Sequence, residues 1–329
     1  MIITRTPFRI SFAGGGSDLP AFYEKHEGCV LSASINKYMY ITIHPAFDKD
    51  TTTIKYMKTE TVKNINDIEH PIAKQILKDY SLSGVEIASI ADVPAGTGLA
   101  SSSAYTVGMI HAVSAFCGKY RSQERIAHDA CKVEIEELGE PIGKQDQYGC
   151  AVGGLKFIRF MSNGAVDVEP ILLSKKCGDK LNNNLLMFYT GKLHSASAIL
   201  KEQSKNTSQT DKFNNLIRMT GLAKELREAL LNESLDDFGR ILNDGWLLKK
   251  EMANGITNPL VDETYEIAMK NGALGGKLLG AGGGGFLLFY CEEDKQPELR
   301  KALSHLVELP FDLDNGGTKV VYVGNKEWR

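Results

Sequence analysis

The sequence predicts an α+β protein in which both halves of the chain combine helices with mixed sheets. Two observations support this fold class. Helical and strand patterns follow one another in both halves, and the chain is 43% hydrophobic and 24% charged, which is the range of a protein with a packed core. A length of 329 residues suits one large domain or two ordinary ones. We expect a boundary within residues 160–185, with an N-terminal domain at 1–175 and a C-terminal domain at 176–329.

The first half begins with a strand at residues 1–13, which three consecutive glycines end. Pro20 lies just inside a short helix, and Ser17 or Asp18 is available as its N-cap. The pattern then predicts, in order, two strands within 29–45, an exposed hairpin or loop at 50–70, a helix at 70–80, a strand at 85–93, an apolar helix at 101–116, an amphipathic helix at 123–138, a glycine-rich loop with a helical turn at 139–154, and a strand at 155–160.

The second half is expected to alternate strands and helices through to its end. Its predicted elements are strands near 165–173 and 184–190, helices at 195–205, 211–232, 235–253 and 259–271, strands near 273–279 and 285–291, a helix at 295–307, and strands at 307–311 and 318–323. The helix at 211–232 carries an apolar stripe of 3.6-residue period, which we assign to the core rather than to a partner surface. The stripe consists of Phe213, Leu216, Ile217, Thr220, Ala223, Leu226 and Leu230.

Charge and cysteine content exclude several classes of protein. Lys plus Arg is 38 and Asp plus Glu is 41, so the net charge is −3 and no basic excess indicates nucleic acid or a membrane surface as partner. The longest uncharged apolar stretch, at 278–291, is too short to span a bilayer. The six cysteines form no CxxC pair and lie near no histidine cluster, so we expect buried reduced thiols in a cytoplasmic protein.

The strongest local signal is a glycine- and serine-rich turn at residues 92–104, between a predicted strand and the start of a predicted helix. The first N–H groups of a helix lack intrahelical partners, and the helix dipole adds positive charge there, so such a turn suits a phosphate. The segment is not a Walker A loop and is a poor dinucleotide fingerprint. The alternative is a structural turn capped by serine.

Two carboxylates stand out in the region that follows. Glu134 lies in line with the apolar stripe of its helix at Ile126, Ala130 and Leu138, so it faces the core and needs a cation or hydrogen-bond donors. Mg²⁺ would meet that need, and so would a Lys or Arg side chain. Asp146 lies between two glycine turns, where a polar residue is usually only a turn former.

Two further glycine segments lie near the ends of the chain. The first is Arg5 to Pro20, where a cation on a strand is followed by Gly14–Gly16 and by Asp18, which could bind sugar hydroxyls. The second is 275–286, which contains four consecutive glycines between strands. Such a run has a large entropic cost and indicates close approach of the backbone to a ligand or to another loop.

Taken together, these segments resemble the GHMP kinase family of small-molecule kinases. The resemblance is carried by three motifs in the family's order, Pro7–Pro20, Pro94–Ala104 and Lys277–Phe286, with Glu134 and the Gly-x-x-Asp-Gln of 143–147 between the last two. Ala100 and Ser103 depart from the family's usual Gly and Ala. The resemblance implies an ATP-binding N-terminal domain like ribosomal protein S5 domain 2 and a ferredoxin-like C-terminal domain.

The resemblance also implies roles for individual residues. Arg9 and Asp146 would be catalytic, with Asp146 orienting and deprotonating the acceptor hydroxyl. Arg9 would lie near Asp146 and the γ-phosphate. Ser102 and Glu134 would hold Mg²⁺. ATP phosphates would bind at Pro94, Gly96, Thr97, Gly98, Leu99, Ala100, Ser101, Ser102 and Ser103. Sugar hydroxyls would bind at Gly15, Gly16, Ser17, Asp18, Gly149, Gly282 and Gly283.

Within the family, residues 14–20 and 254–259 most resemble kinases of D-glycero-D-manno-heptose 7-phosphate, which make the 1,7-bisphosphate for bacterial surface polysaccharides. The expected partners are therefore ATP and a sugar phosphate. The acceptor's own phosphate needs a cation, and the candidates are Arg159, Lys192, His194 and Lys277, with Lys144 as an alternative. Kinases of another sugar, such as fucose or galactose, a decarboxylase of the mevalonate branch and a catalytically silent sensor of sugar and ATP remain alternatives.

Overall fold

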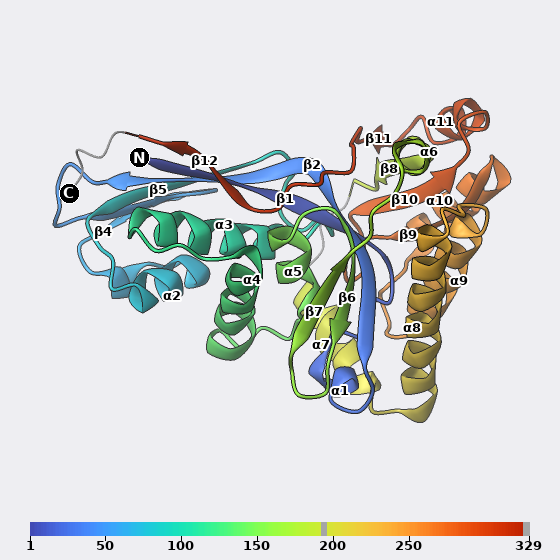
Figure 1. Cartoon of the computed structure of the whole chain (residues 1–329), viewed down its shortest axis with the longest axis horizontal. Coiled ribbons are helices and arrows are strands. Elements are labelled where there is room, and N and C mark those ends of the chain that lie inside the picture. The colour runs from blue at the N-terminus through green and yellow to red at the C-terminus, as the bar shows by residue number, and fades with distance from the viewer. Residues whose placement is uncertain (192–195, 325–329) are drawn as a thin grey trace.

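A computed structural model describes residues 1–191 and 196–324 and shows the expected mixture of helices and strands (Figure 1). The described strands form two sheets. The first has the order β12-β1-β2-β5-β3-β4, with β6 paired to β2 and β7 to β6. The second is antiparallel with the order β11-β8-β10-β9. The predicted α+β class is confirmed.

The strands of the first sheet are β1 (Ile2–Ala13), β2 (Gly28–Pro45), β3 (Thr52–Lys55), β4 (Thr59–Val62), β5 (Val85–Ala91), β6 (Leu155–Phe160), β7 (Val166–Pro170) and β12 (Lys319–Val323); those of the second are β8 (Leu185–Tyr189), β9 (Ala273–Leu278), β10 (Phe286–Cys291) and β11 (Val307–Glu308). The α-helices are α1 (Pro20–Tyr23), α2 (Pro71–Asp79), α3 (Ser101–Phe116), α4 (Gln123–Cys131), α5 (Gln145–Ala151), α6 (Lys175–Asn183), α7 (Ala196–Asn206), α8 (Thr210–Leu231), α9 (Phe238–Lys250), α10 (Pro259–Lys270) and α11 (Gln296–Ala302). Short 3₁₀ and π segments are η1 (Ile65–Asp67) and η2 (Lys132–Glu137). None of these helices has the length and hydrophobicity needed to cross a membrane.

The two strands expected within residues 29–45 are one long strand, β2, so that prediction is wrong. β2 runs beside β1 for most of its length, and it also pairs with β6 at its start and with β5 at its end. Irregularities in the β1–β2 register between Pro7 and Arg9 and between Ser11 and Ala13 accompany this change of neighbour. Because the start and the end of β2 pair with different strands, no turn is needed between them and the strand is continuous.

α3 begins and ends where the sequence predicts and is buried along most of its length, between the first sheet and α4 and α5 (Figure 1). The amphipathic helix expected at 123–138 is α-helical only as far as Cys131 and continues as the π-helical η2. Glu134 lies in this π segment and is 1% exposed. Single π turns inside α-helices often occur at functional sites, and this one carries the buried carboxylate.

Some local expectations are wrong. The N-cap of α1 is Leu19, because the Ser17 hydroxyl donates to the carbonyl of Gly14 and the Asp18 carboxylate accepts from the N–H of Gly16. α6 was not expected, and Gly178 within it weakens the helical pattern. The thiol of Cys117 is exposed, although the other five cysteines are buried as predicted.

The predicted stripe of α8 is mostly buried, although Ile217 is 37% exposed. Ala223, Leu226 and Leu230 pack into the core beneath the first sheet, whereas Leu216 belongs to a second core around β9 and β10. One helix therefore contributes to both cores. The division into domains at 1–175 and 176–329 stays a prediction, and the last strand, β12, pairs with β1.

The glycine-rich turn before α3 contacts the glycine-rich loop after β9. Gly98 has φ +87°, and a Cβ built on it would lie 2.4 Å from the carbonyl oxygen of Leu279. A Cβ on Gly280 would likewise lie 2.7 Å from the Cα of Gly98. The two loops can approach this closely only because positions 98 and 280 are both glycine. This close contact is a reason for the entropically costly glycines in the two loops.

Gly98→Ala should lower the free energy of unfolding by at least about 1 kcal/mol, because the left-handed conformation disfavours a side chain and the new Cβ meets the Leu279 carbonyl. Gly221→Ala is the matched control, since a Cβ there meets no atom within 4 Å and the residue lies inside α8. Urea unfolding of both variants tests this. Equal midpoints for the two variants would contradict it.

Lys156 on β6 is a buried cation whose Nζ donates to Ser34 Oγ (3.0 Å) and to the carbonyl of Gly154 (2.9 Å). Burial lowers its pKa from 10.5 to about 7. Between these two values the unfolded state binds one more proton than the folded state, so this lysine makes the protein more stable as pH rises. Below about pH 7 both states are charged and the cost of burying the ammonium is largest.

Lys156→Met should therefore flatten the rise of unfolding free energy with pH by up to about 1.4 kcal/mol per pH unit between roughly pH 7.5 and 8.5. The exposed Lys176 provides the control variant Lys176→Met, which should leave the slope unchanged. Denaturant unfolding at several pH values measures both slopes. A wild-type slope retained in Lys156→Met would show that the ammonium is not the group responsible.

Candidate active site

A cavity of about 1010 Å³ lies where the two glycine-rich loops meet. Its walls come from both halves of the chain: β1 and the loop after it, the 89–103 segment, Glu134, the start of α5, and residues of α7, α8, α9 and β9. A cavity of this size with a few convergent polar groups is the usual form of a small-molecule site. Most of the residues singled out from sequence line it.

The turn before α3 exposes unpaired backbone groups to this cavity. Gly96 and Gly98 have positive φ, and Ala100, the N-cap of α3, also takes a left-handed conformation with φ 64°. No side chain among the described residues caps this helix end, so its first N–H groups stay available for an anion. Seven of the nine predicted phosphate-loop residues line the cavity, namely Pro94, Gly96, Gly98, Ala100, Ser101, Ser102 and Ser103.

The other two predicted loop residues point away from the cavity. Leu99 is buried in the core, and the Thr97 hydroxyl donates to the carbonyl of Pro94 at 3.0 Å, which fixes the turn. They shape the loop but present no side chain to the cavity. The left-handed conformation of Ala100 also gives a physical reason why glycine would suit that position.

The buried Glu134 carboxylate accepts three hydrogen bonds beside this turn. Ser102 Oγ donates to Oε1 at 2.9 Å, and Oε2 accepts from Ser103 Oγ at 2.9 Å and from Gln147 Nε2 at 2.7 Å. Burial raises the pKa of Glu134, and the three donors act in the opposite direction. No Lys or Arg forms an ion pair with it among the described residues, so the ion-pair alternative weighed from sequence is not what these residues show.

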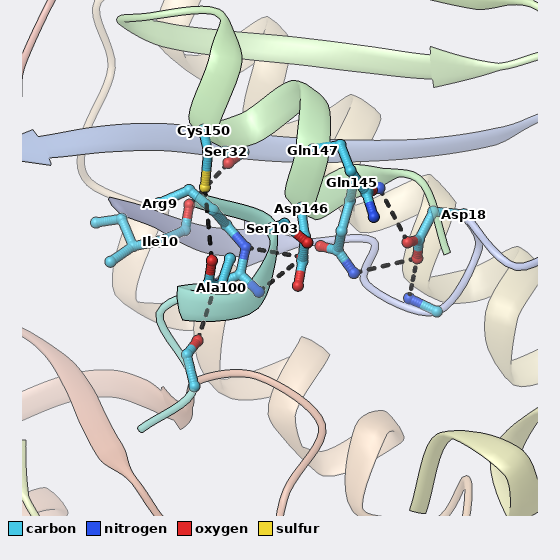
Figure 2. A network of polar contacts seen from close by, with 12 residues as sticks. Arg9, Ile10, Asp18, Ser32, Ala100, Ser103, Gln145, Asp146, Gln147 and Cys150 are labelled. Atoms are coloured by element: carbon cyan, nitrogen blue, oxygen red, sulfur yellow. Dashed lines mark hydrogen bonds and ion pairs between the residues drawn. The ribbon is translucent and has the colours of Figure 1, made fainter. Parts of the chain in front are cut away.

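Arg9 and Asp146 form an ion pair beside the turn that precedes α3 (Figure 2). Nε and Nη2 of Arg9 both donate to Asp146 Oδ1, at 3.0 and 2.7 Å, and Nη1 donates to the carbonyl of Gly98 at 2.8 Å. Arg9 is 3% exposed and Asp146 28%. The expected proximity of the two residues is therefore present, and Asp146 Oδ2 accepts no hydrogen bond from the described residues.

Asp18 lies beside this pair and is held by Gln145, the residue before Asp146 (Figure 2). Its carboxylate accepts from the N–H of Gly16 (2.9 Å) and from the backbone N–H and side-chain amide of Gln145 (3.2 and 3.1 Å). Burial, and then the charge of Asp146, raise its pKa. Sequence analysis missed Gln145 as a site residue, although its place beside Asp146 was a usable signal.

The predicted sugar-binding residues do not all reach the cavity. Gly15, Gly16 and Asp18 line it, whereas the Ser17 hydroxyl is buried against the backbone of Gly14 and Cys29. The remaining three glycines pack against protein: Gly149 against the Arg9 side chain, Gly282 against Ile256, and Gly283 through a backbone hydrogen bond to Ile256.

Only some of the cations considered for the acceptor's phosphate lie at the cavity. Lys277 lines the cavity. Arg159 instead pairs with Asp167 between β6 and β7, and Lys144 Nζ donates to the carbonyl of Gly164 at 2.6 Å, so neither lies in the cavity. Lys192 and His194 lie outside the described residues. Sequence analysis missed Lys249, a cavity-lining residue of α9 that has the spacing of an ordinary helix-surface lysine.

Sequence analysis also missed an aromatic end of the cavity. His70 stacks on Tyr105 with ring centroids 4.7 Å apart and meets the edge of Tyr56 at 4.8 Å, and burial lowers the pKa of His70. Met57, from the turn between β3 and β4, lies at the same end. These residues come from separate, unremarkable segments, so no sequence signal grouped them.

Two domain patterns and several known proteins match the sequence of this chain. The GHMP kinase N-terminal domain pattern matches residues 66–154, and the GHMP kinase C-terminal pattern matches residues 226–308. The D-glycero-alpha-D-manno-heptose 7-phosphate kinase of Campylobacter jejuni is 30% identical, over all of this chain and 99% of its own length. The bifunctional fucokinase/GDP-fucose pyrophosphorylase of Arabidopsis thaliana is 28% identical over 94% of this chain, which matches 32% of that longer protein.

Solved structures show the same relationship. The crystal structure of a D-glycero-D-manno-heptose 1-phosphate kinase from Bacteroides thetaiotaomicron superposes with a TM-score of 0.81 at 25% identity, and covers 99% of this chain and 100% of its own. This chain belongs to the GHMP kinase family, and it is a sugar kinase that uses ATP as phosphate donor.

Proposed function

We propose that the protein transfers the γ-phosphate of ATP to the anomeric hydroxyl of D-glycero-D-manno-heptose 7-phosphate and so forms the 1,7-bisphosphate. The observation that carries the kinase chemistry is the Arg9–Asp146 pair, which lies against Gly98 of the turn before α3. Support for the acceptor comes from the full-length similarity to the Campylobacter jejuni heptose 7-phosphate kinase.

ATP would bind with its phosphates on the turn before α3 and its base at the aromatic end around His70 and Tyr105. The free N–H groups of α3 and the positive φ of Gly96 and Gly98 suit an oxyanion close to the backbone. The stacked rings offer an apolar surface to the base. Both ends belong to one continuous cavity.

Ser102 and Glu134 would hold Mg²⁺. Hydroxyl and carboxylate oxygens are the hard ligands that this ion prefers, and Ser102 Oγ and Glu134 Oε1 lie 2.9 Å apart at the phosphate turn. Among residues 1–191 and 196–324, no group of three or more His, Cys, Asp or Glu side chains could hold a metal ion. Mg²⁺ usually keeps several waters and also takes phosphate oxygens. When bound, Mg²⁺ supplies positive charge that neutralises the phosphates.

Asp146 would receive the proton of the acceptor hydroxyl at Oδ2, the oxygen that Arg9 leaves free. Arg9 would hold the carboxylate in place through Oδ1 and stabilise the negative charge that develops on the transferred phosphoryl group. The remaining nitrogen of Arg9, Nη1, donates to the carbonyl of Gly98. The guanidinium and the Asp146 carboxylate are therefore held in place before any substrate binds. Such positioning is the main source of catalysis in phosphoryl transfer.

The sugar would bind beside Asp146, with hydroxyl groups on Asp18 and on the backbone of Gly15 and Gly16. Asp18 is already oriented by Gln145, so it can accept a sugar hydroxyl without rearrangement. The roles first assigned to Ser17, Gly149, Gly282 and Gly283 become indirect in this proposal. They support the loops and the Arg9 side chain that contact the substrate.

A kinase for an unphosphorylated sugar is the second candidate. The similarity to the fucokinase region of the Arabidopsis thaliana protein supports it. The ATP site, Arg9 and Asp146 would keep the same roles, and only the acceptor would change.

Asp146→Asn should reduce kcat about 10²- to 10⁴-fold, because a general base typically contributes that much. ATP should still bind, since the phosphate turn does not involve Asp146. Turnover by coupled ADP release and ATP affinity by calorimetry test the two statements separately. The control is Asp179→Asn on the exposed surface of α6. Near-normal turnover by Asp146→Asn would remove Asp146 from the mechanism.

A panel of acceptors with ATP and Mg²⁺ should show strong turnover only with D-glycero-D-manno-heptose 7-phosphate. The panel contains the heptose phosphate, mannose 6-phosphate, galactose, fucose and mevalonate. We expect this selectivity because the cavity combines an acid for sugar hydroxyls, Asp18, with cations that the transfer itself does not use. Preference for fucose or galactose would refute the proposed acceptor and favour the second candidate.

A further inference from the structure

One wall of the cavity carries two lysines that the phosphoryl transfer does not use. Lys249 on α9 and Lys277 on β9 both line the cavity, on elements from the second half of the chain. Neither ammonium lies within 4.0 Å of a carboxylate belonging to the described residues. Buried lysines are normally paired with a group of opposite charge.

The contacts of the two ammonium groups are neutral oxygens. Lys249 Nζ donates to Gln203 Oε1 at 2.6 Å, and Lys277 Nζ donates to the carbonyl of Phe12 at 3.3 Å. Gln203 packs against Gly16 of the sugar-side loop, where an added Cβ would lie 2.1 Å from its Nε2. Both ammonium groups are therefore held at the base of the Gly14–Gly16 loop.

A buried hydroxyl at the end of β1 completes the cluster. Ser11 is 5% exposed and lines the cavity, and its Oγ has no hydrogen-bond partner among the described residues. Ser11 precedes Phe12, whose carbonyl accepts from Lys277, and it lies on the same face of β1 as Arg9. A buried hydroxyl without a partner is costly, and a ligand oxygen would satisfy it.

The two lysines lie among charges of both signs. Burial lowers the pKa of Lys277 to about 7, and Lys249 and Arg9 lower it in the same direction. Burial lowers the pKa of Lys249 to about 8, against the opposing effect of Asp18 and Asp146. Lys249 and Arg9 thus disfavour the charged form of Lys277, and an added anion would offset this repulsion and the burial of the two ammonium groups.

We propose that Lys249, Lys277 and the Ser11 hydroxyl bind the acceptor's own phosphate monoester, with Gln203 positioning Lys249. This inference rests on the proposed function and selects among the cations considered for that phosphate. A phosphate monoester carries a charge near −2 at neutral pH and several acceptor oxygens, which matches two ammonium groups and a hydroxyl. A carboxylate carries a single negative charge and would neutralise only one of the two lysines. The substrate class is therefore a sugar that already carries a phosphate away from the reacting hydroxyl.

Lys249→Met and Lys277→Met should each raise the KM for heptose 7-phosphate about 10- to 100-fold, since a hydrogen bond to a charged group is lost. The KM for ATP should stay the same. Inorganic phosphate, with ATP saturating, should inhibit the wild type competitively with the acceptor, and both variants should weaken this inhibition to a similar degree. Methionine has nearly the same volume as lysine, and thermal unfolding checks that the variants fold.

Lys250→Met is the matched control, because Lys250 follows Lys249 in α9 but pairs with Asp262 and does not line the cavity. It should leave both constants unchanged. An acceptor KM that stays within about twofold in Lys249→Met and Lys277→Met, or a rise in the KM for ATP instead, would overturn the inference. The second result would assign the lysines to the nucleotide phosphates.

The same experiment separates this inference from the proposed function. If the wild type phosphorylates only unphosphorylated sugars or mevalonate, the proposed acceptor is wrong, and competition by inorganic phosphate decides the anion site alone. Competition that is lost in Lys249→Met and kept in Lys250→Met would still support an anion site at these lysines. Competition that is equal in both would refute it.

Discussion

The buried guanidinium of Arg9 is the group on which the rest of the site depends. It lies on β1, donates twice to Asp146 on α5 and once to the carbonyl of Gly98 in the turn before α3. Arg9 is 3% exposed, so loss of Asp146 would leave a buried guanidinium without its charged partner. A single side chain thus fixes the distance between the proposed base and the proposed phosphate site, and the three elements that bear them must pack together for this charge to be buried at all.

The cavity concentrates further charged groups that are expensive to bury. Asp18 and Glu134 have carboxylate pKa values raised by burial, and Lys249 and Lys277 have ammonium pKa values lowered by it. None of these four groups forms an ion pair with another of the described residues. Hydrogen bonds from Gln145, Ser102, Ser103 and Gln147 satisfy the carboxylates instead. A protein retains such unfavourable burial where ligands are charged, and a nucleotide with a phosphorylated acceptor is such a ligand set.

Much of this could be predicted from the sequence, for reasons that differ between residues. The apolar character of residues 101–116 located α3, and the position of Glu134 on an apolar stripe predicted its burial. The pairing of Arg9 with Asp146, 137 positions apart, came from the family resemblance, since spacing cannot show which distant residues meet. Lys249, Gln203 and the rings around His70 were missed because tertiary packing alone brings them to the cavity. The single strand β2 was missed because its two ends pair with β6 and β5, distant strands that the local pattern does not reveal.

The pairing of β12 with β1 links Ile2 to Val323. A ribosome therefore makes β1 long before it makes the outer neighbour of β1. Until residues 319–323 have emerged, β1 presents an open edge of unpaired N–H and C=O groups, and an edge of that kind can pair with another nascent chain. The strand that carries Arg9 is thus made long before its pairing can be completed.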